Sequence, residues 1–214
     1  DKTFPTGDCS MCMISPKMVE VGRHLNIDIH TLAEVTSVEG AAGDFKVKVR
    51  LAPRYVDSDR CTGCGECMAK CPKKLSSEFD QGLGIRKAIY TLFPQSVPNV
   101  PAIDAVHCTY LTQGKCRVCE KVCKAKAINY EDKGKEIELT VGSIILSPGL
   151  DRYDARVRGE LGLGRWKNVV SSVQFERILS ASGPYFGHVQ RLSDGKEPKK
   201  IAFIQCIGSR DTNC

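Results

Sequence analysis

Two runs of closely spaced cysteines constrain this chain more than any other feature. The first run reads Cys61-Thr-Gly-Cys64-Gly-Glu-Cys67-Met-Ala-Lys-Cys71-Pro72, which is a C-x2-C-x2-C-x3-C-P spacing. In a run of this kind the first three thiolates wrap one 4Fe–4S cube, and the fourth cysteine serves a different cube. The spacing therefore predicts an iron–sulfur site.

Local chemistry explains this spacing. Thiolates two residues apart in a tight loop can hold one cube while backbone N–H groups turn towards its sulfurs. Gly63 and Gly65 permit the positive φ angles and the close backbone approach that such a loop needs. The next three residues carry Cys71 most of a helical turn away from the first cube, and Pro72 stops the turn from continuing.

A second cube requires a second run of ligands. The C-x2-C-x3-C pattern recurs in the second run, with residues 109–115 between its first two cysteines. If the two runs exchange their last cysteines, two sets of four ligands result. The first ligand set is Cys61, Cys64, Cys67 and Cys123, and the second ligand set is Cys71, Cys108, Cys116 and Cys119. In the competing arrangement each run closes its own cube.

A pair of zinc sites is the alternative to iron–sulfur, because C-x2-C is also a zinc half-site. Zinc does not account for the third cysteine in register or for the terminal Cys-Pro pair. The cysteine pattern therefore favours two 4Fe–4S clusters.

Composition favours a reducing compartment. With 214 residues, 42% of them hydrophobic, the chain can bury a core and form one or two domains. Twelve cysteines, mostly in two runs, require thiolates that are available for metal, which indicates the cytoplasm. Neither a signal peptide nor an apolar run of the ~18 residues of a membrane span is evident, so we expect no membrane insertion. Because the first residue is Asp1 and not Met, we expect an internal segment of a longer polypeptide.

The net charge of +6 is concentrated around the cysteine runs, where residues 60–126 hold eleven Lys or Arg and five Asp or Glu. An oxidised cube with four thiolates carries a charge of about −2, so two cubes offset much of this surplus. The lysines near the cysteines form either a docking face for an acidic electron carrier or merely a solvated face; they are Lys70, Lys73, Lys74, Lys121, Lys124 and Lys126. Nucleic-acid binding is the rival interpretation, but a single Trp and no aromatic–basic groove pattern argue against it.

Outside the cysteine runs the pattern is mixed α/β, so the cysteine-rich module interrupts a larger domain. Ser15-Pro16 predicts a helix that begins there and ends at Gly22, with proline at the first helical position. Ser171 and Gln174 resemble a capping box and predict a helix over residues 173–181. A hairpin loop is expected at residues 40–44. The predicted strands, the last of them buried, are residues 26–30, 34–38, 45–49, 127–130, 137–141, 143–147 and 200–206, and residues 87–93 are a further candidate strand.

Further motifs follow one another along the chain. They are Lys2-Thr-Phe-Pro-Thr, Cys9-Ser-Met-Cys12, Pro16-Lys-Met-Val-Glu-Val-Gly-Arg-His24, Glu34-Val-Thr-Ser-Val-Glu-Gly40 and Ile204-Gln-Cys206-Ile-Gly-Ser-Arg-Asp211. With the two cysteine runs, they resemble the A subunit of heterodisulfide reductase and related flavoproteins of membrane-linked quinone oxidoreductase complexes. The resemblance covers essentially the whole chain.

This resemblance implies an α/β (α+β) fold, in which an incomplete thioredoxin-reductase-like FAD domain is interrupted by an inserted two-cluster ferredoxin domain of the bacterial type. Residues 1–54 would be the first part of the FAD-binding domain, and residues 55–131 the inserted ferredoxin domain. Residues 132–214 would return to the FAD domain and begin a second nucleotide-binding-like domain.

The resemblance also implies half of a flavin site. It places Val35 near the adenine of FAD through its backbone, and Ser147, Gly149 and Leu150 at the turn beside the flavin. The glycine-rich dinucleotide fingerprint would precede Asp1. We therefore expect the segment alone to bind FAD weakly or not at all.

The remaining cysteines are less constrained. For Cys9 and Cys12 three interpretations stay open: ligands of a further cluster, a redox-active dithiol, or buried cysteines that pack as small hydrophobes. The resemblance implies that Cys206 joins later cysteines at another cluster. It gives no role to Cys214.

The expected function is electron transfer by an oxidoreductase subunit that uses flavin and iron–sulfur clusters. Electrons would pass between FAD and the 4Fe–4S clusters to partner subunits of an electron-transfer complex. No Ser-His-Asp or paired-carboxylate arrangement is evident, so we expect no catalytic side chain here. The alternative is a simple ferredoxin-like electron carrier without catalytic activity of its own.

Overall fold

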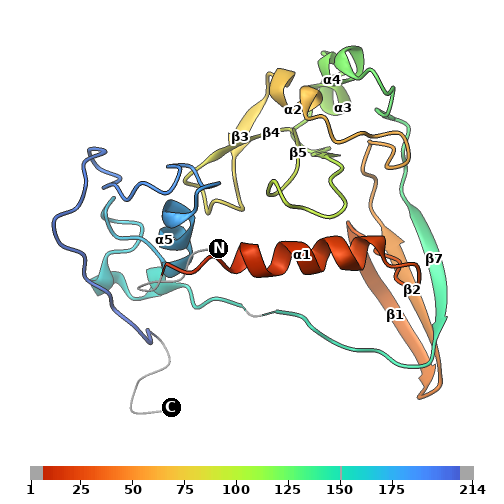
Figure 1. Ribbon diagram of the computed structural model, residues 1–214, viewed down its shortest axis with the longest axis horizontal. Coiled ribbons are helices and arrows are strands. Elements are labelled where there is room, and N and C mark those ends of the chain that lie inside the picture. The colour runs from red at the N-terminus through yellow and green to blue at the C-terminus, as the bar shows by residue number, and fades with distance from the viewer. Residues whose placement is uncertain (1–6, 150, 208–214) are drawn as a thin grey trace. The chain divides into compact units, whose positions relative to one another are not determined.

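The computed structural model describes residues 7–149 and 151–207 (Figure 1). These residues form two compact units, each described by itself below. The cysteine unit contains Met13–Leu75 and Arg86–Ser147, and therefore both cysteine runs. The C-terminal unit contains Ser76–Ile85 and the described parts of Asp1–Cys12 and Pro148–Cys214.

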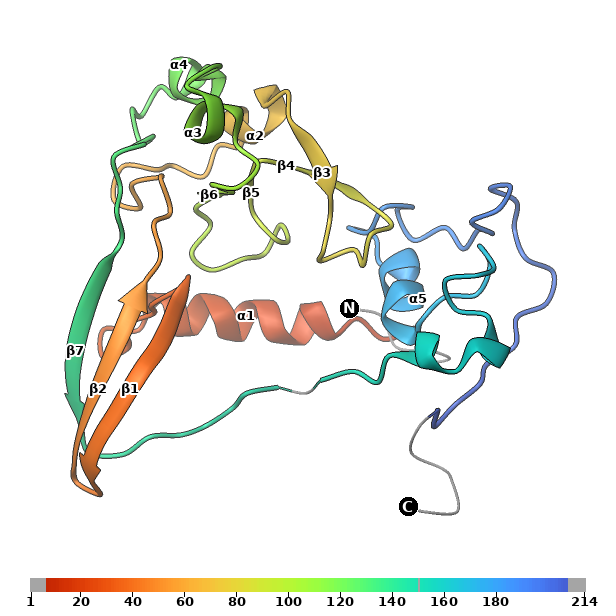
Figure 2. The ribbon, with the colours of Figure 1, turned by 180° about the vertical axis from the view of Figure 1, so that it is seen from behind.

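A three-stranded antiparallel sheet in the order β1-β2-β7 belongs to the cysteine unit (Figure 2). Its strands are β1 (Ala33–Ala41), β2 (Asp44–Leu51) and β7 (Lys135–Val141). Side chains alternate along β2, where Val47 and Val49 are buried while Lys46 and Lys48 are exposed. This alternation places one face of the central strand against apolar neighbours.

The strands predicted at residues 34–38, 45–49 and 137–141 are confirmed, and so is the hairpin between the first two. Ala41 pairs with Asp44 across a tight turn in which Gly43 has a φ of 95°. β2 and β7 are neighbours in the sheet although residues 52–134 separate them in sequence. The chain therefore leaves the sheet after one strand and returns to it beside that same strand (Figure 2).

Short elements fill the segment between β2 and β7. They are α2 (Glu66–Lys70), β3 (Lys74–Ser76), β4 (Ile85–Lys87), β5 (Ile89–Tyr90), β6 (Ala102–Ile103), α3 (Thr109–Gln113) and α4 (Val118–Val122). The strands form two pairs, β3 with β4 and β5 with β6. A buried cluster joins aliphatic side chains to two cysteines of the runs: Val56, Cys67, Ile89, Val100, Ile103, Cys108 and Ala127. The core of this segment is thus built around the cysteines.

Four predicted strands are wrong. Residues 127–130 form no strand, and only Ile128 makes an isolated bridge, with Val56. Residues 26–30, 143–147 and 200–206 contain no strand, and the last segment is exposed instead of buried. Residues 143–147 are exposed as well, with Ile145 and Leu146 at 90% and 84%. A strand needs a neighbour for its backbone N–H and C=O groups, and no strand among the described residues pairs with these segments. The apolar pattern of a segment does not indicate whether a neighbouring strand is present to pair with it.

The first helix also differs from its prediction. α1 spans Ser10–Arg23, so it begins five residues earlier than Ser15, and Pro16 lies inside the helix instead of at its first position. A proline inside a helix removes one backbone hydrogen bond but can be accommodated. In the described part of the chain, no helix has the length and apolar character needed to cross a membrane.

The C-terminal unit contains η1 (Ala155–Val157), η2 (Gly159–Leu161) and α5 (Ser172–Leu179). The helix predicted at residues 173–181 is confirmed as α5. A buried arginine fixes it within the unit, because Arg177 Nε donates to Asp80 Oδ1 at 3.0 Å and the guanidinium lies 4.6 Å from the centre of the Phe79 ring.

The predicted capping box is present at the start of α5. The Gln174 backbone N–H donates to Ser171 Oγ at 3.2 Å, and the Ser171 N–H donates to Gln174 Oε1 at 3.0 Å. We expect Ser171→Ala to lower the free energy of unfolding of the C-terminal unit by about 1 kcal/mol, whereas Ser172→Ala at the exposed next position should change it little. Urea denaturation followed by fluorescence of the single tryptophan, Trp166, would measure both. Equal effects of the two substitutions would contradict a role for the cap.

Candidate iron–sulfur centres

The first cysteine run has the backbone that its glycines predict. Gly63 and Gly65 have φ angles of 67° and 77°, in the left-handed region. Helix α2 begins directly after Gly65 and carries the buried Cys67. Cys71, with φ −63° and ψ 124°, ends the helix in an extended conformation before Pro72. The run is thus a left-handed loop followed by a single helical turn.

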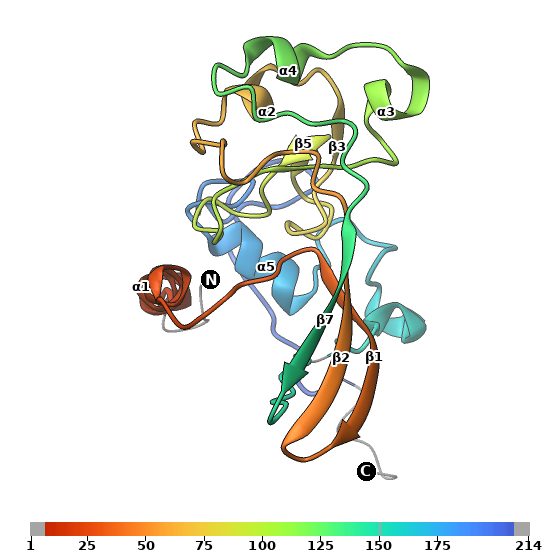
Figure 3. The ribbon, with the colours of Figure 1, turned by 90° about the vertical axis from the view of Figure 1, so that its right-hand side faces the viewer.

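The second run repeats this structure. Arg117 adopts the left-handed conformation (φ 64°) at the position that Gly65 holds in the first run, and α4 follows it. Cys119 is the second residue of α4, as Cys67 is of α2, and an extended Cys123 ends the helix. The two helices pack against each other (Figure 3). Both runs therefore bring their cysteines to one region of the cysteine unit.

A cavity in this unit is lined by all four cysteines of the second ligand set, namely Cys71, Cys108, Cys116 and Cys119. No acidic side chain is among the residues that line this cavity, whereas Lys73 and Arg117 are. Four thiols with two cations and apolar walls suit a cluster of net negative charge, so these residues fit a 4Fe–4S cube. The structure thus brings together cysteines from both runs, and Cys71 lies with the second run.

Cys67 is the buried cysteine of the first ligand set. Burial, followed by the neighbouring thiols of Cys119, Cys61 and Cys123, raises the pKa of Cys67 to about 11. Cys64 of the same set is exposed. A thiol with a raised pKa becomes a ligand only by releasing its proton to solvent as the metal binds. Cys67 therefore lies near thiols of both runs, that of Cys61 from the first run and those of Cys119 and Cys123 from the second.

Hydrogen-bond donors point at several of these sulfurs, as the spacing predicts. The Gly63 N–H donates to Cys61 Sγ at 3.5 Å, and the Ala127 N–H donates to Cys123 Sγ at 3.3 Å. Donors at a sulfur stabilise the negative charge of a ligating thiolate and tune the cluster. Within residues 7–149 and 151–207, no three histidine, cysteine or acidic side chains converge as they would around a single metal ion.

Two side chains at this site are not predicted by the cysteine spacing. The Tyr130 hydroxyl lies 3.0 Å from Cys119 Sγ, and Lys87 Nζ donates to the Cys71 backbone carbonyl at 2.6 Å. Burial, followed by the hydrogen bond with Cys119, raises the pKa of Tyr130, which keeps its proton at neutral pH. Neither residue stands at a fixed distance from a cysteine in a known motif, so the sequence carries no signal for them.

Comparison with known proteins agrees with this geometry. Residues 54–74, which contain the whole first run, match the 4Fe-4S binding domain family. The chain is 48% identical over 211 residues to the A subunit of the "H(2):CoB-CoM heterodisulfide,ferredoxin reductase" of Methanothermobacter thermautotrophicus. It is 49% identical over 210 residues to the iron-sulfur A subunit of the CoB--CoM heterodisulfide reductase of Methanocaldococcus jannaschii. It is 53% identical over 211 residues to the second such A subunit of Methanopyrus kandleri.

The chain is homologous to part of the A subunit of heterodisulfide reductase. The matches cover 98–99% of the chain but only 31% of the length of these relatives. The resemblance predicted from the motifs is thereby confirmed, and so is a 4Fe–4S binding segment at residues 54–74. The regions matched in these relatives also include the elements outside the cysteine runs.

The other cysteines of this chain lie apart from the runs in sequence. Cys9 is half-buried directly before α1, and Cys12 is an exposed residue of its first turn, with its N–H donating to the Cys9 carbonyl at 3.2 Å. Exposure of Cys12 does not fit a purely buried, structural cysteine. Cys206 is exposed with a φ of 57°. Cys214 lies outside the described residues.

One of the residues implied for the flavin lies in the sheet. Val35 is in β1, 58% exposed, and pairs with Val49 of β2. Ser147 and Gly149 lie in the strandless segment that follows β7. Leu150 lies outside the described residues. Val35 and Ser147 belong to the cysteine unit, and Gly149 belongs to the C-terminal unit.

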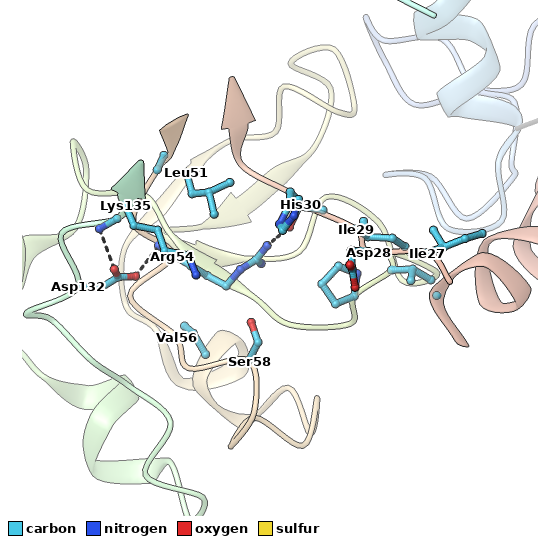
Figure 4. A pocket seen from close by; sticks show the side chains of 16 residues that line it. Ile27, Asp28, Ile29, His30, Leu51, Arg54, Val56, Ser58, Asp132 and Lys135 are labelled. Carbon is cyan, nitrogen blue, oxygen red and sulfur yellow. Dashed lines mark hydrogen bonds between the residues drawn. The ribbon is translucent and has the colours of Figure 1, made fainter. Parts of the chain in front are cut away.

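A recess of about 510 Å³ in the cysteine unit lies where the segment between β2 and β7 joins the sheet. Arg54 extends across it from Asp132 towards His30 (Figure 4). Its guanidinium donates to the Val100 carbonyl at 2.8 Å and also to Thr31 Oγ1. Desolvation by burial lowers the pKa of Arg54. Through these hydrogen bonds, Arg54 joins the loops on either side of the recess.

Proposed function

We propose that this segment of a heterodisulfide reductase-type protein binds two 4Fe–4S clusters and passes single electrons between them. A bound 4Fe–4S cluster accepts and gives up one electron at a time, and the chain's part is to ligate, space and tune the two clusters. One observation carries the proposal: a single cavity is lined by the four cysteines of the second ligand set, one of which comes from the other run.

The proposed ligands are the two sets with exchanged last cysteines. The cavity supports the second set, and the neighbours of Cys67, which include Cys61 and Cys123, support the first. The proximity of Cys67 and Cys119 on the packed helices α2 and α4 would hold the two clusters close together. Short separation favours rapid electron passage from one cluster to the other.

For the longer protein we propose a thioredoxin-reductase-like FAD domain into which the cluster module is inserted. The sheet topology supports this, because the chain leaves after β2 and returns beside it as β7. Residues 1–54 and 132–214 would then belong mainly to the FAD domain and residues 55–131 to the insertion. Val35, Ser147, Gly149 and Leu150 remain the proposed flavin contacts, and Cys9, Cys12 and Cys206 the proposed ligands of further clusters.

The proposed partners are other subunits of a cytoplasmic electron-transfer complex, and an acidic electron carrier. The names of the relatives support this, since they describe subunits of CoB–CoM heterodisulfide reductases. The name of the Methanothermobacter thermautotrophicus relative also includes ferredoxin. The docking-face lysines Lys70, Lys73, Lys74, Lys121, Lys124 and Lys126 are all exposed. Their positive charge would attract an acidic protein towards the clusters.

Metal content tests the proposal. After anaerobic reconstitution, the chain should contain about eight irons and about eight sulfides, as two 4Fe–4S clusters require. Zinc, measured in the same samples, should be substoichiometric. About four irons per chain would contradict the two-cluster assignment, and stoichiometric zinc without sulfide would favour the zinc alternative.

A further inference from the structure

One cysteine of the second ligand set has a side-chain hydroxyl at its sulfur. The Tyr130 hydroxyl lies 3.0 Å from Cys119 Sγ, and both residues line the cavity. When Cys119 is bound to iron as a thiolate it has no proton to give, so the tyrosine must be the donor. The contact is then an O–H···S bond to a cluster ligand.

Two neighbouring residues hold the Tyr130 ring in place. The Tyr110 ring packs on it with a centroid distance of 4.2 Å and an interplanar angle of 47°. The Arg117 guanidinium lies 5.1 Å from the centre of the Tyr110 ring and 5.8 Å from that of Tyr130. Glu120 fixes this arginine with a 2.7 Å bond from Nη2 to Oε1. The hydroxyl is therefore aimed at Cys119 by a packed aromatic pair and not by a mobile side chain.

The donors at the first ligand set are of a different kind. Cys61 and Cys123 accept from the backbone N–H groups of Gly63 and Ala127, at 3.5 and 3.3 Å. Backbone donors come with the fold of any such loop, whereas a side-chain donor is an addition that the sequence can make or remove. Tyr130 thus supplies its hydroxyl to the second ligand set.

We infer that Tyr130 is a positioning residue that raises the reduction potential of the cluster at the second ligand set relative to the other cluster. Reduction adds negative charge to the cluster and its sulfurs, and a hydrogen-bond donor at a sulfur stabilises the reduced form more than the oxidised form. Tyr130 would then shift an electron shared between the two clusters towards the second ligand set. The inference rests on the proposed function, because it needs both clusters.

Potentiometric titration followed by EPR, on the anaerobically reconstituted full chain, tests the inference. Tyr130→Phe keeps the ring and removes the hydroxyl. We expect one cluster to become about tenfold harder to reduce, which is about 59 mV for a one-electron couple, and the other to keep its midpoint. Tyr110→Phe removes a hydroxyl from the adjacent ring and should leave both midpoints unchanged.

A second pair of experiments identifies the cluster and avoids dependence on one variant. 3-Fluorotyrosine at position 130 preserves the packing and makes the hydroxyl a stronger donor, so the same midpoint should rise. Cys71→Ala is expected to remove the cluster at the second ligand set. In that background, Tyr130→Phe should have no effect on the midpoint of the remaining cluster. Iron analysis separates the two claims. About eight irons with both midpoints unmoved by either substitution at 130 would overturn the role of Tyr130 alone. About four irons in the unmodified chain would overturn the ligand sets as well.

Discussion

Replacing Cys71 with alanine should remove the cluster at the second ligand set and leave the cluster at the first ligand set in place. Iron should fall from about eight to about four per chain, because a cube that loses one of its four thiolates is expected to disassemble. Cys123→Ala should cause the same loss of iron but remove the other cluster. The EPR spectra of the two reduced variants should therefore add up approximately to the spectrum of the unmodified chain.

Double substitutions distinguish the exchanged ligand sets from the competing arrangement in which each run closes its own cube. With exchange, Cys71→Ala combined with Cys108→Ala should lose no more iron than Cys71→Ala alone, since both ligands serve one cluster. Combined with Cys61→Ala, it should lose nearly all iron. The competing arrangement predicts the opposite pair of results. Because all variants carry alanine at cysteine positions, general destabilisation would affect both double variants alike.

The local structure of the cysteine runs was predictable because it depends on neighbouring residues. Gly63 and Gly65 adopt the positive φ angles that their positions require, and α2 ends at the residue before Cys71, as Cys71-Pro72 predicts. Arg117 shows the limit of this reasoning. It adopts the same left-handed conformation as Gly65 without being glycine, and is held there by Glu120 and two aromatic rings.

Strand pairing was less predictable because it depends on distant partners. Residues 45–49 alternate and pair on both sides, with β1 and with β7. Residues 143–147 and 200–206 are as apolar but have no paired strand in the part of the chain that the structure describes. Periodicity identifies a segment that is able to pair; it does not say whether a neighbour is present.

Side chains that join distant segments could not be found from the sequence. Tyr130 reaches Cys119 across a turn, and no spacing rule connects a tyrosine with a cluster ligand. Asp132 is a still clearer case. Its carboxylate binds backbone groups at the other end of the cysteine-rich segment, so that its role becomes visible only when the two ends of that segment are brought together.

Asp132 closes the cysteine-rich segment where it leaves and re-enters the sheet. Oδ2 accepts from the Arg54 and Tyr55 N–H groups at 2.9 and 3.1 Å, and Oδ1 accepts from the Gly134 N–H at 2.9 Å. Desolvation alone would raise the pKa of this carboxyl, but the backbone donors of Gly134, Tyr55 and Arg54 outweigh it and hold the pKa below its ordinary value of 3.8. The carboxylate therefore stabilises the folded state.

Asp132→Asn should destabilise the cysteine unit by about 3 kcal/mol, because an amide has one acceptor oxygen and would present its NH2 group to a backbone donor. Loss of cluster absorbance in urea should become about a hundredfold faster, if local opening at these ends precedes cluster loss. Glu131→Gln, at the exposed preceding carboxylate, is the matched control and should change the rate little. An equal acceleration in both variants would show that charge, and not the three bonds, matters here.

The pH dependence gives an independent check of the same role. A carboxyl whose pKa is lowered by folding contributes its full stability above its unfolded pKa and loses it as the pH falls through the folded pKa. Since both values lie at or below 3.8, the difference between Asp132→Asn and the unmodified chain should be constant from about pH 6 to about pH 8. A difference that changed across this interval would assign the effect to a group that titrates there, such as a histidine, and not to the Asp132 carboxylate.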